Sequence, residues 1–334
     1  MCLHWHAVLD GETGVTRVLV TGATGFVGQT LCERLTQAGF VVRAALRTER
    51  AVAASVSEKT VSGDITGATK WDVALENVDV VVHLAARTHV LHDSATDAEL
   101  HMKINADGTQ ALAAESVRRG VRRFIYLSTV KVNGEGLAER AYSAADEPRP
   151  QDAYGASKWL GEQRLWAVAA STSMQAVVVR APLVYGPGVS ANFLRLLRWV
   201  DAERWLPLGA VQNRRSLVSV WSLCDLLLRA LDHPAAAGAT CMVSDDEDIA
   251  TLELVRRLAR LMGRRLRLLS VPASLLRLAG AMLGKREDVR RLCGSLTVDI
   301  APTRALLGWS PPLPMDEALG RTVQWYRSER HARA

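Results

Sequence analysis

One short segment constrains the fold of this 334-residue chain more than any other. Residues 21–28 read Thr-Gly-Ala-Thr-Gly-Phe-Val-Gly, directly after an apolar run and directly before a helical pattern. Gly22 permits a tight turn, Gly25 lets the backbone approach a pyrophosphate, and Gly28 lets the helix pack closely on the strand. The helix N-terminus adds N–H donors for phosphate oxygens. The predicted dinucleotide-binding loop comprises Gly22, Thr24, Gly25, Phe26, Val27 and Gly28.

The rest of the first half alternates apolar runs with helical patterns, which predicts an α/β fold with a Rossmann-type, doubly wound parallel sheet. After Gly186-Pro187-Gly188 the chain becomes more helical and richer in arginine, which predicts a smaller α-rich C-terminal cap. The expected parts are a flexible extension at 1–16, a NAD(P)-binding domain at 17–185 with returning segments near 216–245, and a cap at 186–215 and 246–330. Expected strands are Arg17–Val20, Phe40–Ala45, Thr60–Ile65, Asp79–Ala86, Arg123–Val132, Ala176–Arg180, Val218–Val220 and Thr240–Ser244, and expected helices are Phe26–Ala38, Ala95–Arg119 and Ala153–Ala170.

Composition excludes several other classes of protein. With 49% hydrophobic residues the chain can bury a full core, so it is not disordered. The net charge of +6 comes from 41 basic against 35 acidic residues, and only six of the basic residues are lysines. No aromatic residues interleave with the arginines of the C-terminal cluster (Arg256, Arg257, Arg260, Arg264, Arg265, Arg267, Arg290 and Arg291) to stack bases, so we expect no nucleic-acid partner. No apolar run reaches the ~20 residues of a membrane span, and the five scattered cysteines indicate a reducing cytoplasm and no metal site.

The residue that follows the second strand bears on the choice of cofactor. An acid about 20 residues after the loop would bind the ribose 2′-hydroxyl of NAD, whereas an arginine there suits the 2′-phosphate of NADP. This chain has Leu46 and Arg47 at that place and no acid. The sequence therefore favours NADP(H) and leaves NAD(H) open.

A helical Tyr-x-x-x-Lys pair supplies candidate catalytic groups. Tyr154 and Lys158 lie four residues apart, on one face of the expected helix. A lysine ammonium group beside a phenol stabilises the phenolate and lowers its pKa toward neutrality, which makes an acid–base catalyst. Ser128 and Thr129 end a strand upstream and could hydrogen-bond a reacting carbonyl oxygen.

Together these patterns resemble the extended short-chain dehydrogenase/reductase family, in its NAD-dependent nucleotide-sugar epimerase/dehydratase branch. The resemblance is closest to the UDP-N-acetylquinovosamine 4-keto reductases and the UDP-sugar 4-epimerases, and it covers nearly the whole chain. The motifs that carry it are Thr21–Gly28, Gly63-Asp64-Ile65, His83-Leu84-Ala85-Ala86, Asn105 to Thr109, Leu127-Ser128-Thr129, Tyr154 to Lys158, and Arg180 to Gly188.

The resemblance implies a role for each matched residue. Tyr154 would be the general acid/base, Lys158 would tune it and bind the nicotinamide ribose, and Thr129 would polarise the carbonyl. Asp64 would meet the adenine, Ala85 would line the pyrophosphate path, and Asn105 would help to hold the active-site region. Further implied cofactor contacts are Ile65, Leu84 and Ala86, and implied substrate contacts are Ser128, Thr129, Asn192 and Arg215.

The resemblance also narrows the reaction. Related 4,6-dehydratases carry Asp-Glu after the catalytic Thr, and Val130-Lys131 in this chain lacks those carboxylates. The remaining reactions are reduction of a 4-keto-6-deoxy sugar, as in surface-polysaccharide precursor synthesis, and 4-epimerisation with tightly bound NAD. Arg47 suits NADPH, which a reductase exchanges on every turnover, so the sequence favours the reductase, with the UDP-sugar 4-epimerase as alternative. A non-catalytic dinucleotide-binding protein is a weaker alternative, since such relatives usually lose the Tyr or the Lys.

The C-terminal half resembles a UDP-sugar site. In the segment Asn213 to Val218, Arg215 aligns with a diphosphate-binding arginine, while Asn192 belongs to a segment that clasps the nucleotide. Arg286 is a further candidate for the diphosphate. The expected helices Ala95–Arg119 and Ala153–Ala170 match those that form an intersubunit four-helix bundle in the family, which implies a homodimer.

Overall fold

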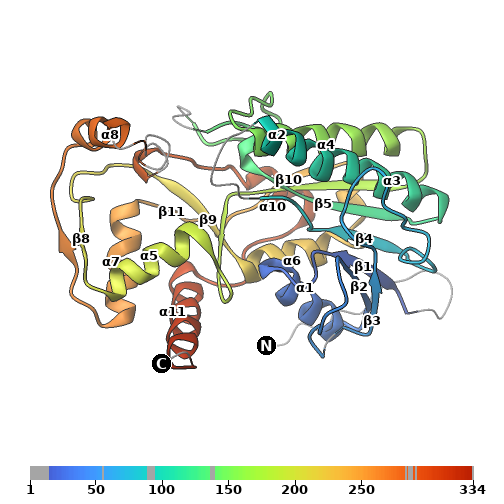
Figure 1. Cartoon of the computed structure of the whole chain (residues 1–334), viewed down its shortest axis with the longest axis horizontal. Helices are drawn as coiled ribbons and strands as arrows, with labels where there is room; N and C mark the ends of the chain where they lie inside the picture. The colour runs from blue at the N-terminus through green and yellow to red at the C-terminus, as the bar shows by residue number, and fades with distance from the viewer. Residues whose placement is uncertain are drawn as a thin grey trace. The chain divides into compact units, whose positions relative to one another are not determined.

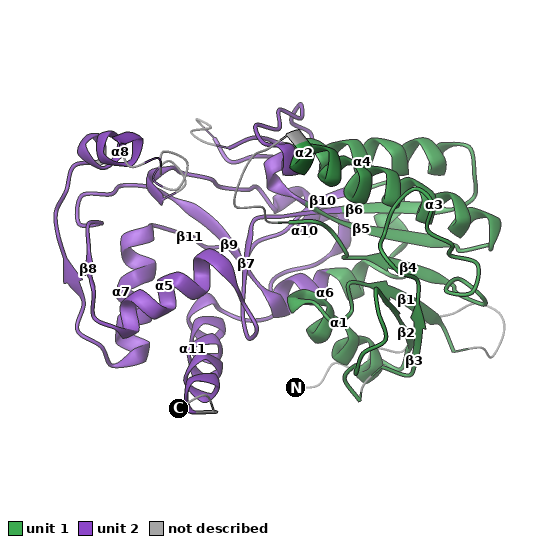
Figure 2. Cartoon of the chain, in the orientation of Figure 1, with its two compact units in different colours: residues 1–128, 156–178, 227–239 green, residues 129–155, 179–226, 240–334 purple. Residues whose placement is uncertain are grey.

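The computed structural model describes residues 15–54, 56–88, 95–135, 140–282, 284, 289 and 292–332. Arg286 and nearly all of the predicted N-terminal extension lie outside these residues. The chain divides into two compact units, which Figure 2 colours separately. Unit 1 comprises Met1–Ser128, Ala156–Val178 and Leu227–Ala239, and unit 2 comprises Thr129–Gly155, Val179–Leu226 and Thr240–Ala334.

The main sheet has seven strands in the order β10-β6-β5-β4-β1-β2-β3, and the pairs among β3, β2, β1, β4 and β5 are parallel. The predicted doubly wound parallel sheet is therefore confirmed. The chain starts at β1 in the middle, runs out to β3 and crosses back to β4, so β1 and β4 form the switch point at which such sheets bind ligands. The strands are β1 (Arg17–Thr21), β2 (Val41–Leu46), β3 (Glu58–Val61), β4 (Val80–His83), β5 (Arg123–Thr129), β6 (Gln175–Ala181) and β10 (Thr240–Met242).

Helices cover this sheet on both faces, which explains why the middle residues of its central strands are continuously apolar. Figure 1 shows α3 and α4 along one face, where Leu112 and Leu165 join a buried cluster with Leu19 and Val81, and α1 on the other. The helix expected over 95–119 is interrupted by a π-helical turn, Lys103–Asp107, and the strand expected to reach residue 132 ends earlier in a 3₁₀ turn, Val130–Val132. The helices are α1 (Phe26–Gln37), α2 (Ala95–Met102), α3 (Gly108–Arg118) and α4 (Ala153–Ala170).

Unit 2 contains a separate three-stranded sheet in the order β11-β9-β7. We expected Val218–Val220 to return to the main sheet, but β9 pairs with β7 and β11 instead. Pro182 explains the difference, because it ends β6 and diverts the chain into β7, which then offers β9 a parallel partner. The remaining elements are β7 (Leu183–Tyr185), β8 (Trp205–Leu206), β9 (Arg215–Ser219), β11 (Asp248–Ile249), β12 (Arg267–Leu268), α5 (Ala191–Asp201), α6 (Val220–Ala230), α7 (Thr251–Met262), α8 (Ala273–Met282), α10 (Ala301–Leu307) and α11 (Met315–Ala332).

Within the part of the chain that the structure describes, none of the helices combines the length and the apolar character that crossing a membrane requires.

Candidate active site

The glycine loop of unit 1 closes tightly between β1 and α1. Gly22 has φ +71°, and a Cβ there would lie 2.9 Å from the backbone nitrogen of Ala85. A Cβ on Gly28 would lie 2.1 Å from the carbonyl oxygen of Gly22, so the helix sits directly against the loop. Gly25 is the N-cap of α1, and no described side chain caps this end or places an acid in its first turn. The loop thus fits a pyrophosphate, which the helix N-terminus attracts.

A buried chain of hydrogen bonds runs beneath this loop. Thr109 donates to the carbonyl oxygen of Asn105 (2.7 Å), so its hydroxyl oxygen accepts from Nε2 of His83 (3.1 Å). Nδ1 of His83 is left to accept from the Thr21 hydroxyl (2.6 Å), which itself accepts from the N–H of Ala85 (3.2 Å). The imidazole is therefore neutral with a fixed tautomer, and it anchors the predicted segment Leu84–Ala86 beside the loop.

The other predicted cofactor residues of unit 1 lie after β2 and β3. The side chains of Arg47 and Asp64 are exposed, and Nε of Arg47 lies 3.9 Å from Oδ1 of Asp64. Ile65 packs against Gly108, where a Cβ would come within 2.5 Å of its Cγ2 atom. Ile65 therefore helps to seat α3, and the two charged side chains remain available at the surface.

Asn105 lies in the π-helical turn and is buried. Its Oδ1 accepts from the N–H of Arg87 (2.8 Å), and its Nδ2 donates to the carbonyl of Arg87 (3.0 Å) and to Oγ of Ser157 (2.9 Å). The side chain thereby ties the segment after β4 to α4. The role of Asn105 in holding the active-site region remains a prediction.

Lys158 is enclosed in unit 1, with 1% of its surface exposed. Its Nζ lies 3.9 Å from the ring centroid of Tyr126, and that ring stacks on His83. Burial lowers the pKa of Lys158 to about 7. The charge of Glu162 has the opposite effect and raises this pKa. Burial, together with the charge of Lys158, lowers the pKa of His83 to about 3.

Glu162 is a residue that the sequence analysis did not single out. Its side chain is fully buried on α4, and the hydroxyl of Ser128 donates to it. The hydroxyl assigned to the substrate is therefore engaged with Glu162. The spacing of four residues from Lys158 on one helix could have revealed Glu162, because such pairs face each other.

We expect Glu162→Gln to lower the pKa of Lys158 further, because the variant loses the charge that raises it but keeps an acceptor for Ser128. The alkaline limb of the kcat/KM profile should then move to lower pH by about one unit. Glu115→Gln on α3, which removes a glutamate that pairs with Arg118 and Arg119, is the matched control and should leave the profile in place. An alkaline limb unchanged in Glu162→Gln would contradict this role.

Thr129 and Tyr154 belong to unit 2. Thr129 is buried at the end of β5, and its Oγ1 accepts from the N–H of Lys131 (3.3 Å). Tyr154 is partly buried in the first turn of α4, one turn before Lys158 on the same helix. Burial, reinforced by the charge of Asp152, raises the pKa of Tyr154 above its ordinary value.

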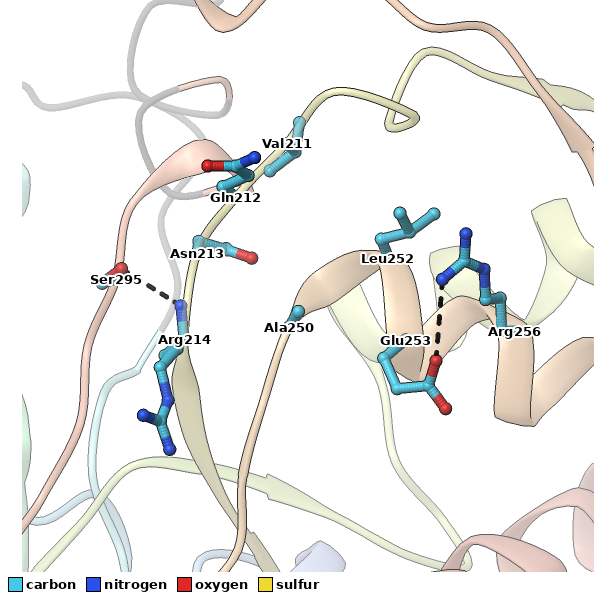
Figure 3. A pocket seen from close by; sticks show the side chains of 9 residues that line it. All are labelled: Val211, Gln212, Asn213, Arg214, Ala250, Leu252, Glu253, Arg256 and Ser295. Carbon is cyan, nitrogen blue, oxygen red and sulfur yellow. Dashed lines mark hydrogen bonds and ion pairs between the residues drawn. The ribbon is translucent and has the colours of Figure 1, made fainter.

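The predicted substrate residues lie on α5 and β9 of unit 2. Asn192 is exposed in the first turn of α5 and accepts from Arg195 (3.1 Å). Arg215 is half-buried and donates to the carbonyl of Gly294 (3.3 Å). A hollow of about 460 Å³ opens beside β9, and its lining includes Arg214 but not Arg215 (Figure 3).

The chain is similar to known proteins along nearly its full length. The chain is 42% identical over 311 residues to the UDP-glucose 4-epimerase of Vibrio cholerae, covering 92% of this chain and 94% of that protein. It is 26% identical over 325 residues to the N-acetyl-alpha-D-glucosaminyl-diphospho-ditrans,octacis-undecaprenol 4-epimerase of Escherichia coli O157:H7, covering 92% and 94%. Among solved structures, MoeE5 in complex with UDP-glucose and NAD is 26% identical, with a TM-score of 0.78 over 94% of this chain and 99% of that one.

The expected cofactor and the expected family can both be checked against these relatives. The related structure holds NAD, and the predicted preference for NADP finds no support. The sequence pattern of the NAD dependent epimerase/dehydratase family matches residues 18–243, which is more than half of the chain. The resemblance predicted from the motifs is confirmed, and the chain belongs to the NAD dependent epimerase/dehydratase family of enzymes.

Proposed function

We propose that this enzyme is a UDP-sugar 4-epimerase. The observation that carries the proposal is the 42% identity to a UDP-glucose 4-epimerase along almost the full length of both chains. Thr129, Tyr154 and Lys158 are all present, and Val130-Lys131 lacks the carboxylates that would serve an elimination. The proposal takes up the alternative that the sequence left open, in preference to the 4-keto reductase.

We propose NAD as the cofactor, bound by the glycine loop and the N-terminus of α1. The open helix end and the close approach of Gly22 to Ala85 support a pyrophosphate there. Arg47, on which the expectation of NADP rested, lies within ion-pair distance of Asp64 and shares its charge with that carboxylate. We also retain Leu84, Ala85, Ala86 and Asn105 as residues along the cofactor path.

The chemistry of this chain's own residues follows from their placement. When bound, the nicotinamide supplies the hydride acceptor and donor for the sugar C4. Tyr154, as the phenolate, removes the proton of the 4-hydroxyl group and, as the phenol so formed, later returns it. The ammonium group of Lys158 stabilises the phenolate that stands before the first of these steps and after the second. Thr129 hydrogen-bonds the C4 oxygen and orients the sugar, while Arg215 meets the diphosphate and Asn192 the nucleotide.

The test is conversion of UDP-sugars by the purified protein. We expect UDP-glucose and UDP-galactose, or UDP-GlcNAc and UDP-GalNAc, to reach the same mixture from either side without net change in NADH absorbance. Consumption of NADPH with a UDP-4-keto-6-deoxy sugar, in the absence of any interconversion, would overturn the proposal in favour of the reductase. Chromatography of the sugar nucleotides distinguishes the two outcomes directly.

The proposal also assigns the two ligands to separate parts of the chain and includes a homodimer. Residues 17–185, with returning segments near 216–245, would bind the cofactor, and residues 186–215 and 246–330 would bind the sugar nucleotide. A homodimer through helices of the 95–119 and 153–170 regions remains a prediction, which light scattering in solution would check.

A further inference from the structure

Three charged side chains of unit 2 lie together next to the first turn of α4. Lys131, in the 3₁₀ turn after β5, forms ion pairs with Glu135 and with Asp152. The exposed fractions of these side chains are 25% for Lys131, 8% for Glu135 and 17% for Asp152. Lys131 thus pairs with two acidic side chains at a site with little exposure to water, where charges interact over longer distances than in bulk water.

This cluster is joined to the turn of α4 that carries Tyr154. Asp152 accepts from the N–H of Gly155 (2.6 Å) and so caps the start of the helix. A Cβ on Gly155 would lie 2.9 Å from the carbonyl oxygen of Lys131, so the two backbones are in close contact. Nζ of Lys131 lies 6.0 Å from the ring centroid of Tyr154. The position of the phenol is therefore linked to the Lys131–Asp152 pair.

The same side chains set the electrostatic environment of the phenol. Burial works against ionisation of Asp152, but the bonds from Lys131 and from Gly155 hold the pKa of its carboxyl below the ordinary value. Among the described residues of unit 2, the charge of Asp152 acts on the phenol and Nζ of Lys131 lies over its ring, while Glu135 pairs with Lys131. Without Lys131, the carboxylate of Asp152 would lose this cation and stand beside a group that must become an anion.

We propose that Lys131 is a positioning residue for Tyr154: its ammonium group holds Asp152 at the start of α4 and offsets the charge of that carboxylate beside the phenol. The proposal rests on the proposed role of Tyr154 as the acid–base group of the 4-epimerase. It assigns a use to the residue that stands where the related dehydratases carry an acid.

The test is titration of Tyr154 in the full-length protein saturated with NAD. The tyrosinate absorbance of each variant is measured as a difference from the same variant carrying Tyr154→Phe. Lys131→Met should raise the pKa of Tyr154 by about one unit or more. Asp152→Asn should lower it by a similar amount, because asparagine keeps the helix cap and loses the charge. Lys131→Arg keeps the cation and should restore the wild-type value.

The opposite directions of these shifts separate the proposal from a merely structural role. The acid limb of kcat/KM for 4-epimerisation should move with the titration, upward in Lys131→Met and downward in Asp152→Asn. An unchanged pKa of Tyr154 in both variants, or pKa shifts in the same direction, would overturn the inference. If Lys131→Met fails to fold, Lys131→Gln, which also removes the cation, takes its place in the titration. Absence of epimerase activity in the wild type would refute the proposed function, while the titration would still decide the role of Lys131.

Discussion

Replacing Tyr154 with phenylalanine is expected to lower kcat for 4-epimerisation by about 10²–10⁴-fold, the contribution of a general acid–base group. The substitution removes one hydroxyl from a partly buried ring and leaves the packing of α4 in place. The free energy of unfolding should therefore change by no more than about 1 kcal/mol. Initial rates with UDP-glucose and thermal unfolding of the same preparation measure the two effects.

Tyr326→Phe is the matched control for this experiment. It deletes the same group from α11 of unit 2, where the phenol donates to Asp201 at 3.2 Å. Its kcat should equal that of the wild type. A Tyr154→Phe enzyme that kept more than about a tenth of wild-type kcat would show that another group moves the proton, since one pKa-tuned acid–base residue contributes far more than tenfold.

The proposed acid–base pair could be predicted from the sequence because its geometry is local. Tyr154 and Lys158 are one helical turn apart, so the periodicity of a single helix fixes their common face. The glycine loop is local in the same sense, since a strand, a turn and a helix N-terminus follow one another in sequence. The parallel sheet followed from strands that are buried on both faces and alternate with helices.

The contacts that tune the site could not be found in this way, because they join segments distant in sequence. Lys131 meets Asp152 only when the turn after β5 packs on α4. The expectation of NADP rests on Leu46 and Arg47 at the end of one strand, and Asp64, the neighbour of Arg47, follows a different strand. A charged residue in a sequence does not reveal which partner neutralises it.

The second large effect is expected from Gly28→Ala. The added methyl group would lie 2.1 Å from the carbonyl oxygen of Gly22 and 2.7 Å from Cα of Ala23. Both obstacles are backbone atoms of the loop that would cradle the pyrophosphate, so relief of the clash must displace the loop or the first turn of α1. Such overpacking costs about 1–3 kcal/mol in stability.

The same displacement should weaken NAD binding by about 10–100-fold, because a loss of about 1.4 kcal/mol in binding free energy is a factor of ten. Calorimetric titration with NAD and thermal unfolding measure both effects. Gly320→Ala is the control, since it lies within α11 and its nearest neighbour outside the helix backbone is a leucine side-chain atom at 4.0 Å. There alanine should stabilise the helix by about 0.5–1 kcal/mol and leave NAD affinity unchanged. If Gly28→Ala bound NAD as tightly as Gly320→Ala, the loop would not be the pyrophosphate site, and the cofactor would have to be held elsewhere on the sheet.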